Sequence, residues 1–401
     1  MLHLVADANI PAAREAFAGF GEVRLLPGRE ITRDALVAAD VLLVRSVTRV
    51  DAALLEGTPV RFVGTATAGT DHVDGDALRR LGVAFASAPG SNAASVVDYV
   101  LAALLALASS RGEGLAGKTL GVVGAGQVGS RLVPRARALG LEVVASDPPL
   151  AASGADVGVP LVGLAELLAA ADVVTLHTPL TTPAESDHPT LGLIGDESLA
   201  AMAPGAWLVN AARGRIVDGG ALARSLDRRH LAAAVLDVWP GEPEPAPGLV
   251  RRVAVGTPHI AGYAFDGKVA GTRMLERALR DWHRPPPTPT PPAPWDARPT
   301  LAPPSPLVVD APPAPADAHA PAQRAAWLHA LARQAYDVGA DDARFRTALS
   351  GASDRAAAFA ALRKAYPVRR EWSGYAVRGA VPAPLRRAVR EGLGMALAAD
   401  S

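Results

Sequence analysis

Three polar residues in the second half of the chain have side chains suited to acid–base chemistry on a small acid. They are Arg213 in NAARG, Glu242 in PGEPEP and His259 in TPHIAG, and each follows a predicted strand. An arginine holds a carboxylate with two parallel hydrogen bonds, and a histidine moves a proton near neutral pH. A glutamate beside the histidine fixes its tautomer and raises its basicity. Singly, each is more often a turn, solvated or capping residue, so the hypothesis depends on their occurring together.

A glycine-rich loop lies upstream of these three residues. Strand 119–123 leads into Gly124-Ala125-Gly126-Gln127-Val128-Gly129, a helix follows, and the next strand ends at Asp147. In a dinucleotide site the first glycine permits a tight turn, the second lets the backbone approach a pyrophosphate, and the third lets helix and strand pack closely. The plainer interpretation is a glycine turn beside a capping aspartate. The spacing favours a site in which Asp147 binds the adenosine ribose, and its charge favours NAD over NADP.

With a nicotinamide nearby, the three polar residues form a hydride-transfer site for a 2-hydroxy acid. Arg213 would hold the carboxylate and His259 would take the hydroxyl proton, while NAD takes the hydride. Residues that follow parallel strands gather at one edge of the sheet, which is where ligands bind in such folds.

The elements that position these residues alternate between short apolar runs and alanine-rich helical patterns. Uniformly apolar strands between helices predict parallel sheets covered on both faces. We expect two such sheets, before and after about residue 115, with strands at 2–5, 41–44, 61–65, 83–86, 119–123, 142–146, 173–177, 207–210, 233–237 and 253–256. Helices are expected at 12–18, 129–139 and 220–227, among others.

Composition narrows the class of protein. The 401 residues contain 40 basic and 40 acidic side chains and no cysteine, which excludes disulfides, thiol nucleophiles and cysteine-ligated metal sites. A hydrophobic fraction of 49% excludes a mostly disordered chain. No targeting segment is apparent, and the uncharged stretch 99–110 is too short to span a bilayer, so we expect a buried helix and a cytoplasmic protein.

Prolines divide the chain. Of the 35 prolines, 15 lie between 285 and 321, which predicts an extended linker containing one short strand candidate at 307–309. The tail from residue 322 carries 13 basic and 7 acidic residues, so the zero net charge combines an acidic body with a basic tail. A basic tail is a nucleic-acid candidate, but such a surface is more often solvated or faces an acidic partner.

The motifs GAGQVG, HTPL, NAARG, LDVWPGEP and TPHIAG resemble those of the D-isomer-specific 2-hydroxyacid dehydrogenases. The segments DANIP, LLVRSVTRV, FVGTATAGTDHVD, SAPGSNAASVVDYV, YDVGADDARFR and RREWSGYAV resemble one branch of that family over nearly the whole chain. The resemblance implies NAD-dependent oxidation of 4-phospho-D-erythronate to 2-oxo-3-hydroxy-4-phosphobutanoate in pyridoxal 5′-phosphate (vitamin B6) biosynthesis.

The resemblance also implies roles for individual residues. The catalytic set is Arg213, Glu242 and His259, with His259 as proton acceptor and donor. The substrate contacts are Ser46, Thr67 and Tyr263. The NAD site is formed by Gly124, Gly126, Gln127, Val128, Gly129, Asp147, Thr175, Asp237 and Gly262. Ser46 and Thr67 follow predicted strands, although loop capping is their commoner use.

The implied architecture is a bilobal α/β protein with a homodimer interface at its C-terminus. A flavodoxin-like substrate domain takes 1–94 and 260–284, and an interdomain helix takes 95–114. A Rossmann NAD-binding domain takes 115–258, the proline-rich linker 285–321, and a small α+β dimerisation domain 322–401. The chain departs from the family pattern at Ser91, Gly192 and Ala212, and its linker is long.

Three alternatives remain open. The same chemistry on another acid, such as phosphoglycerate or glyoxylate, would use the same residues. A non-catalytic NAD-sensing scaffold or corepressor would share the fold, although the intact catalytic set argues against it. Nucleic-acid binding by the basic tail is not expected. No metal site is expected at Asp71-His72-Val73-Asp74, because ligands this close need distant partners; Asp74 is predicted to cap the following helix.

Overall fold

The fold is described from a computed structural model that covers residues 1–283 and 307–398. The described chain forms two compact units, which are considered separately. Unit 1 contains residues 1–93 and 263–283, and unit 2 contains residues 94–262 and 307–398. The chain therefore changes unit after Ala93 and after Gly262, and it has changed unit again where the described residues resume at 307.

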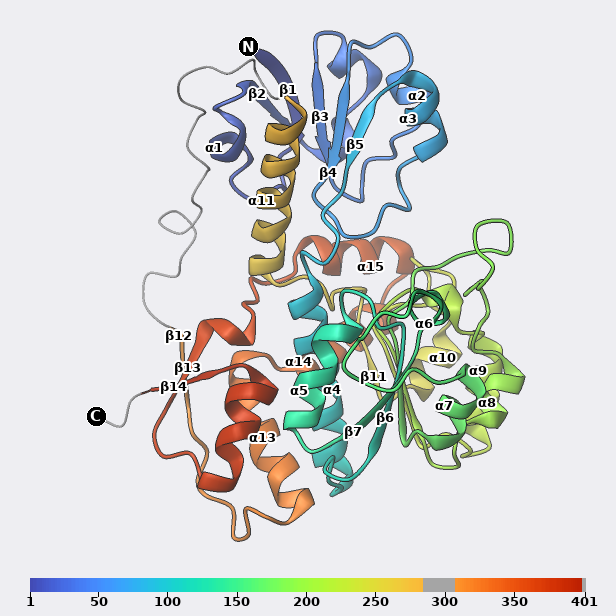
Figure 1. The fold of residues 1–401 in the computed structure, drawn as a ribbon, viewed down its shortest axis with the longest axis vertical. Helices are drawn as coiled ribbons and strands as arrows, with labels where there is room; N and C mark the ends of the chain where they lie inside the picture. The colour runs from blue at the N-terminus through green and yellow to red at the C-terminus, as the bar shows by residue number, and fades with distance from the viewer. Residues whose placement is uncertain (284–306, 399–401) are drawn as a thin grey trace. The chain divides into compact units, whose positions relative to one another are not determined.

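Unit 1 is built on a five-stranded parallel sheet (Figure 1). Its strands are β1 (Leu2–Asp7), β2 (Gly21–Leu26), β3 (Val41–Val44), β4 (Phe62–Thr65) and β5 (Ala84–Ala86). Their order, β2-β1-β3-β4-β5, is the flavodoxin-like order, so the predicted fold is confirmed. The prediction did not include β2, whose polar Glu22 and Arg24 are exposed on an edge strand and interrupt its apolar pattern.

Helices cover both faces of the unit 1 sheet. On one face, α1 (Ala13–Phe17) and α11 (Phe265–Trp282) bury apolar side chains against β1, β3 and β4. On the other, α2 (Ala52–Leu55) and α3 (Gly75–Leu81) pack with β3 and β4. As predicted, Asp74 caps α3, its Oδ1 accepting from the Ala77 N–H at 2.9 Å.

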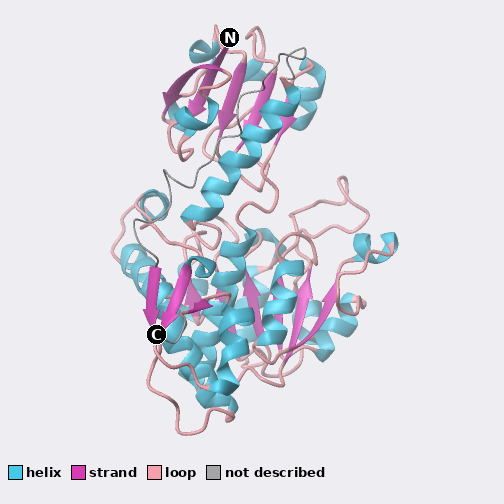
Figure 2. Ribbon diagram, turned by 60° about the vertical axis from the view of Figure 1, so that its left-hand side comes forward, coloured by secondary structure: helices cyan, strands magenta, loops and turns pink. Residues whose placement is uncertain are grey.

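Unit 2 is built on a six-stranded parallel sheet of order β11-β10-β9-β8-β6-β7 (Figure 2). The strands are β6 (Thr119–Val123), β7 (Glu142–Ser146), β8 (Val173–Leu176), β9 (Trp207–Asn210), β10 (Ala233–Leu236) and β11 (Val255–Gly256). Leu161 makes a single parallel bridge to Ala145 on the outer side of β7. With Leu161 in the place of a further strand, the order is that of the Rossmann fold, as predicted.

The helices of unit 2 also lie on both faces of its sheet. Helix α5 (Gly129–Ala138) packs on the side of Val122, whereas α7 (Leu164–Ala170) packs on the side of Gly121. Because neighbouring strand residues face opposite ways, the two helices cover opposite faces. The face of α7 also carries α8 (Asp196–Ala201), α9 (Gly219–Asp227) and α10 (Pro247–Arg252), and α6 (Pro148–Ser153) follows β7.

Helix α4 (Ala93–Arg111) is an apolar core helix. Among the residues that the structure describes, it alone is long and apolar enough to cross a membrane, and 78% of its apolar window is buried in the fold. This burial confirms the buried helix predicted for 99–110.

The C-terminal part of unit 2 has a three-stranded parallel sheet of order β12-β13-β14. Its elements are β12 (Leu307–Asp310), α13 (Pro321–Ala335), α14 (Val338–Ser350), α15 (Arg355–Lys364), β13 (Tyr375–Arg378) and β14 (Ala396–Leu397). The strand predicted at 307–309 is present as β12, whereas 284–306, most of the predicted linker, lies outside the described residues. The prediction did not include β13 and β14.

Helices α14 and α15 share a hydrophobic core with the six-stranded sheet. Phe345, Leu349 and Phe359 pack in the same cluster as Trp239, and the rings of Phe345 and Trp239 stack with centroids 5.2 Å apart. Asp342 accepts from the Gly256 N–H at 2.7 Å. Short single-turn helices complete the fold: η1 (Gly28–Glu30), η2 (Arg33–Leu36), η3 (Gly214–Ile216), η4 (Trp372–Gly374), η5 (Ala383–Leu385) and the π-helical η6 (Ala388–Leu393).

Candidate active site

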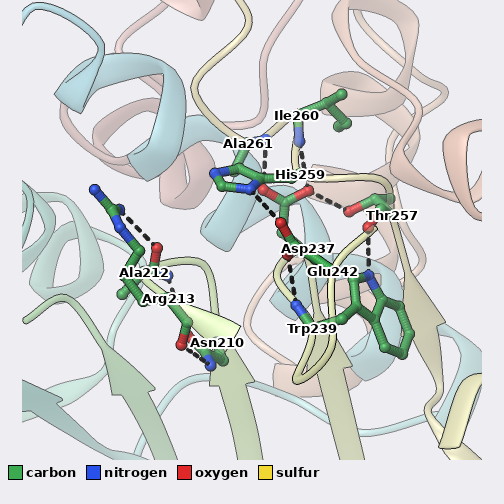
Figure 3. A network of polar contacts seen from close by, with 10 residues as sticks. All are labelled: Asn210, Ala212, Arg213, Asp237, Trp239, Glu242, Thr257, His259, Ile260 and Ala261. Atoms are coloured by element: carbon green, nitrogen blue, oxygen red, sulfur yellow. Dashed lines mark hydrogen bonds and ion pairs between the residues drawn. The ribbon is translucent and has the colours of Figure 1, made fainter. Parts of the chain in front are cut away.

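The three residues predicted to be catalytic follow three neighbouring strands of the unit 2 sheet. Arg213 follows β9, Glu242 follows β10 and His259 follows β11, and these strands pair in the order β11-β10-β9 (Figure 3). Since all three strands are parallel, their carboxyl ends lie at the same edge. This is the edge at which ligands bind in open α/β sheets.

Glu242 and His259 form a hydrogen-bonded pair. His259 Nδ1 lies 2.8 Å from Glu242 Oε2, and the other carboxylate oxygen accepts from the Trp239 N–H at 2.6 Å. An ionised carboxylate only accepts hydrogen bonds, so Nδ1 donates to Glu242, and in the neutral form of the ring Nε2 has a free lone pair. Both side chains are partly exposed, at 34% for His259 and 24% for Glu242. The pair can therefore act as an oriented general base.

The loop that carries His259 is held by Asp237. Its carboxylate is 1% exposed and accepts from the Thr257 hydroxyl, the Ile260 N–H and the Ala261 N–H at 2.7 to 2.8 Å. His259 has a φ of 59°, a conformation that costs a residue with a side chain about 1–3 kcal/mol. Three hydrogen bonds to one buried carboxylate stabilise that conformation. Asp237, expected to contact NAD, thus holds the loop that carries His259.

The turn that carries Arg213 is fixed by the side chain of Asn210, which bonds to the backbone of the turn. Asn210 Nδ2 donates to the Arg213 carbonyl at 2.9 Å, and Asn210 Oδ1 accepts from the Ala212 N–H at 3.1 Å. A Cβ on Gly214 would lie 2.0 Å from the Trp239 carbonyl oxygen, so only glycine fits there. The Arg213 guanidinium donates to the Ala212 carbonyl at 2.9 Å (Figure 3).

The glycine-rich loop has the geometry of a dinucleotide cradle. Gly124 has a φ of +92°, and a Cβ on Gly129 would lie 2.2 Å from the Gly124 carbonyl oxygen, so strand and helix approach closely. A Cβ on Gly126 would meet nothing within 4 Å, which leaves its backbone open to a ligand. Gln127 is exposed, and Val128 directly precedes α5. The N–H groups at the start of α5 suit an anion.

Asp147 lies beside this loop at the end of β7. Its Oδ2 accepts from the Ala125 N–H at 2.9 Å, and its Oδ1 accepts from the Leu150 N–H at 3.1 Å as the cap of α6. Asp147 therefore does cap a helix, as the plainer interpretation of the sequence held. Because a carboxylate has about four acceptor positions, capping leaves room for ribose hydroxyls.

The end of β8 and the two residues that follow it, His177 and Thr178, lie beside the glycine-rich loop, against Gly124. Thr175 is buried, and its hydroxyl lies 3.0 Å from His177 Nε2. Burial lowers the pKa of His177 to about 3, so its ring is neutral. A Cβ on Gly124 would lie 2.9 Å from Thr178 Cγ2, and the buried Thr178 hydroxyl makes no hydrogen bond within the described chain. Thr178 is thus a further candidate for the cofactor site; it lies in the HTPL motif, but the sequence alone predicted no role for it.

The residues predicted to contact the substrate belong to unit 1. Ser46 follows β3 and is exposed, and Thr67 follows β4 and is partly buried. Tyr263 is the first residue of the second segment of unit 1, residues 263–283, and Lys268 Nζ lies 4.8 Å from its ring centroid. Gly262, expected in the NAD site, is the last residue of unit 2 before that segment. Across 1–283 and 307–398, no group of three or more potential ligands is arranged for a metal ion.

Comparison with known proteins agrees with this geometry. The family described as "D-isomer specific 2-hydroxyacid dehydrogenase, NAD binding domain" matches residues 104–261, which hold the glycine-rich loop and all three predicted catalytic residues. A domain of unknown function, DUF3410, matches residues 311–390. Fold, site and family together define an NAD-dependent oxidoreductase of the D-isomer-specific 2-hydroxyacid dehydrogenase class.

Full-length relatives narrow the class. The chain is 51% identical to erythronate-4-phosphate dehydrogenase of Salinibacter ruber, over 99% of both chains. It is 49% identical to the enzyme of that name from Azotobacter vinelandii, over 97% of this chain and 98% of the relative. Accordingly, the chain belongs to the erythronate-4-phosphate dehydrogenase family.

Solved structures share the fold of a little over 70% of the chain. The TT0316 protein of Thermus thermophilus is 31% identical, with a TM-score of 0.61 over 72% of this chain and 100% of that one. A glyoxylate reductase from Paecilomyes thermophila is 25% identical, with a TM-score of 0.59 over 71% of this chain and 95% of that one.

Proposed function

We propose that the chain oxidises 4-phospho-D-erythronate with NAD to 2-oxo-3-hydroxy-4-phosphobutanoate, a step of pyridoxal 5′-phosphate biosynthesis. The observation that carries the proposal is the Glu242–His259 pair, 2.8 Å apart, in a chain whose full-length relatives bear this enzyme name. Bound NAD supplies the hydride acceptor. The C2 hydroxyl proton goes to His259 Nε2, and the C2 hydride leaves with its electron pair, so a ketone forms.

The residues of unit 2 divide this task. Arg213 holds the substrate carboxylate, and Glu242 keeps His259 in the tautomer whose Nε2 accepts the proton. As His259 becomes an imidazolium, the carboxylate beside it stabilises the new charge. For the cofactor, we propose contacts from the loop 124–129 and from Asp147, Thr175, Asp237 and Gly262.

The remaining assignments rest on family membership. Ser46, Thr67 and Tyr263 are proposed to contact the substrate. The domain boundaries predicted above, with a NAD-binding domain at 115–258 and a dimerisation domain at 322–401, belong to the same proposal. A cytoplasmic homodimer is proposed with them.

A substrate panel tests the activity directly. Purified protein is assayed with NAD and with NADP on 4-phospho-D-erythronate, 3-phospho-D-glycerate, glycolate and D-lactate. We expect kcat/KM for 4-phospho-D-erythronate to exceed the others at least about tenfold, because 3-phospho-D-glycerate is one carbon shorter and glycolate and D-lactate lack the phosphate. Equal rates across the acids would refute the assignment, and a preference for NADP would refute the role of Asp147.

Replacing His259 separates an enzyme from an NAD-binding scaffold. His259→Ala removes the proton acceptor and leaves the loop 124–129 untouched. We expect turnover to fall by about 10²–10⁴-fold while the affinity for NADH, followed by fluorescence titration, stays unchanged. The exposed His188→Ala is the matched control. Unchanged turnover in His259→Ala would remove histidine from the mechanism.

A further inference from the structure

A chain of three side chains lies at the carboxyl edge of the unit 1 sheet. His72 Nε2 lies 2.9 Å from the Thr65 hydroxyl, which lies 2.7 Å from the Thr67 hydroxyl. The Thr67 hydroxyl in turn lies 2.8 Å from the Gly69 carbonyl oxygen. Thr65 is fully buried at the end of β4, whereas Thr67 and His72 are partly exposed.

Counting protons fixes the direction of every bond in this chain. A carbonyl oxygen only accepts, so the single Thr67 proton goes to Gly69. Thr67 must then accept from Thr65, which has no second proton to offer. Thr65 therefore accepts from His72, and Nε2 of His72 carries a hydrogen.

The ionisation of His72 does not reverse this order. Burial lowers the pKa of His72, against a smaller opposing effect of Asp71, so the ring is neutral at pH 7 with its hydrogen on Nε2. Protonation at lower pH would add a hydrogen at Nδ1 and leave the Nε2 donor in place. The Thr67 hydroxyl thus keeps one orientation throughout.

We propose that Thr67 meets the substrate as a hydrogen-bond acceptor and recognises its C3 hydroxyl, with His72 as the positioning residue; this rests on the proposed function. The Thr67 oxygen has two lone pairs, and the Thr65 proton occupies one. The remaining lone pair repels the oxygens of an ionised carboxylate or phosphate but accepts from a hydroxyl. Of the two hydroxyls in 4-phospho-D-erythronate, the one at C2 gives its proton to His259. The C3 hydroxyl is the donor that remains.

A deoxy analogue tests what Thr67 recognises. Wild type, Thr67→Val and Thr67→Ser are assayed on 4-phospho-D-erythronate and on D-2-hydroxy-4-phosphobutanoate, which lacks the C3 hydroxyl. We expect the wild type to prefer 4-phospho-D-erythronate (the 3-hydroxylated acid, called the hydroxylated acid below) by about 100-fold or more in kcat/KM. A site that pairs with the C3 hydroxyl rejects the analogue without it. Thr67→Val should lose most of this preference by losing rate on the hydroxylated acid alone, and Thr67→Ser should retain it.

The possible failures are distinguishable. Equal losses on both acids in Thr67→Val would show that Thr67 contacts another part of the substrate and would overturn this inference. A wild type that lacks activity on 4-phospho-D-erythronate would instead overturn the proposed function.

The state of His72 is measured without activity. In a ¹⁵N spectrum of the full chain at pH 7, assigned by comparison with His72→Gln, we expect a protonated Nε2 and an unprotonated Nδ1. A hydrogen on Nδ1 alone would reverse the chain and overturn the proposal.

Two substitutions then test positioning. His72→Phe removes the donor, and His72→Gln restores an N–H donor. We expect His72→Phe to reduce the preference for the hydroxylated acid and His72→Gln to recover it. A merely structural His72 would lower the melting temperature in His72→Phe without changing the ratio of kcat/KM between the two acids.

Discussion

At the residue scale, the proposed proton transfer depends on which nitrogen of His259 carries the hydrogen. The carboxylate of Glu242 settles this, because one of its oxygens faces Nδ1 and the other is held by the Trp239 N–H. An amide in its place offers the ring either an oxygen or an NH₂ group, so the tautomer is no longer imposed.

We therefore expect Glu242→Gln to lower kcat by about 10²–10⁴-fold with little change in NADH affinity. Glu244→Gln, at an exposed position two residues further along, is the control and should leave kcat unchanged. Steady-state kinetics and NADH titration measure both effects. A Glu242→Gln enzyme of wild-type kcat would mean that backbone geometry alone orients His259.

His177 makes a prediction about stability and pH. Its folded pKa of about 3 is below the ordinary 6.5, so between these values only the unfolded chain binds the proton. The contribution of His177 to the free energy of unfolding is therefore complete above pH 6.5. It falls on acidification by at most about 1.4 kcal/mol per pH unit.

Urea unfolding of His177→Gln should accordingly depend less steeply on pH between 7 and 5 than wild type does. His188→Gln, at an exposed position, should keep the wild-type slope. Identical slopes in all three proteins would show that His177 is solvated in the folded state.

At the scale of elements, the sequence predicts best where one strand is buried on both faces. Strands β6, β8 and β9 are continuous apolar runs and occur at their predicted positions, with β8 one residue shorter. Strand β2 was missed because an edge strand with Glu22 and Arg24 exposed has no such run. Strand β14 has only two residues, too few for any pattern.

The candidate site shows the same division. The Gly124–Gly129 spacing and the order Arg213, Glu242, His259 are local signals that sequence carries. The three donors gathered on Asp237, and the hydroxyl of Thr178 beside Gly124, are made by residues brought together only by folding. Such long-range contacts leave no period or spacing in one sequence.

One long-range contact joins the C-terminal segment to the catalytic loop. Arg369, which follows α15, is buried, donates to the Ala261 carbonyl and lies 4.3 Å from the ring centroid of Tyr336. Ala261, which lies two residues beyond His259, also donates its N–H to Asp237. Arg369 is therefore a positioning residue for the loop.

We expect Arg369→Lys to lower kcat by about tenfold and to lower the melting temperature, because an ammonium cannot both stack on Tyr336 and reach the carbonyl in the same geometry. Arg390→Lys, at an exposed position, is the control. Thermal unfolding and kinetics are compared in the same preparation. A lower melting temperature with unchanged kcat would restrict Arg369 to a role in stability.

At the scale of the whole molecule, the arginines of the basic tail largely make contacts within the chain. Arg346 pairs with Asp342 at 2.8 Å and donates to the Val250 and Val253 carbonyls. Arg355 donates to the Leu349 and Pro245 carbonyls at 2.9 Å each, and Arg378 pairs with Asp310 at 2.7 Å. These contacts give the many arginines of the tail a structural role, and this role does not require nucleic acid.

The hydrophobic core that the tail shares with the NAD-binding sheet leads to a prediction about whether the two can be separated. Phe345 stacks on Trp239, and Gly256 of β11 has no room for a Cβ, since one would lie 2.9 Å from the Trp239 ring. We expect Phe345→Ala to lower the free energy of unfolding by about 3–5 kcal/mol, as for a buried aromatic in a close-packed core. Phe85→Ala, at a position 40% exposed, should cost much less.

Deleting residues 306–401 should accordingly disturb the NAD-binding sheet itself, and not only the proposed dimer. It uncovers Trp239 and removes the Asp342 acceptor from the Gly256 N–H, three residues before His259. We expect the shortened chain to lose NADH binding and cooperative thermal unfolding together, as followed by fluorescence and circular dichroism. A shortened chain that unfolds cooperatively and still binds NADH would show instead that the proposed dimerisation domain folds separately from the NAD-binding sheet.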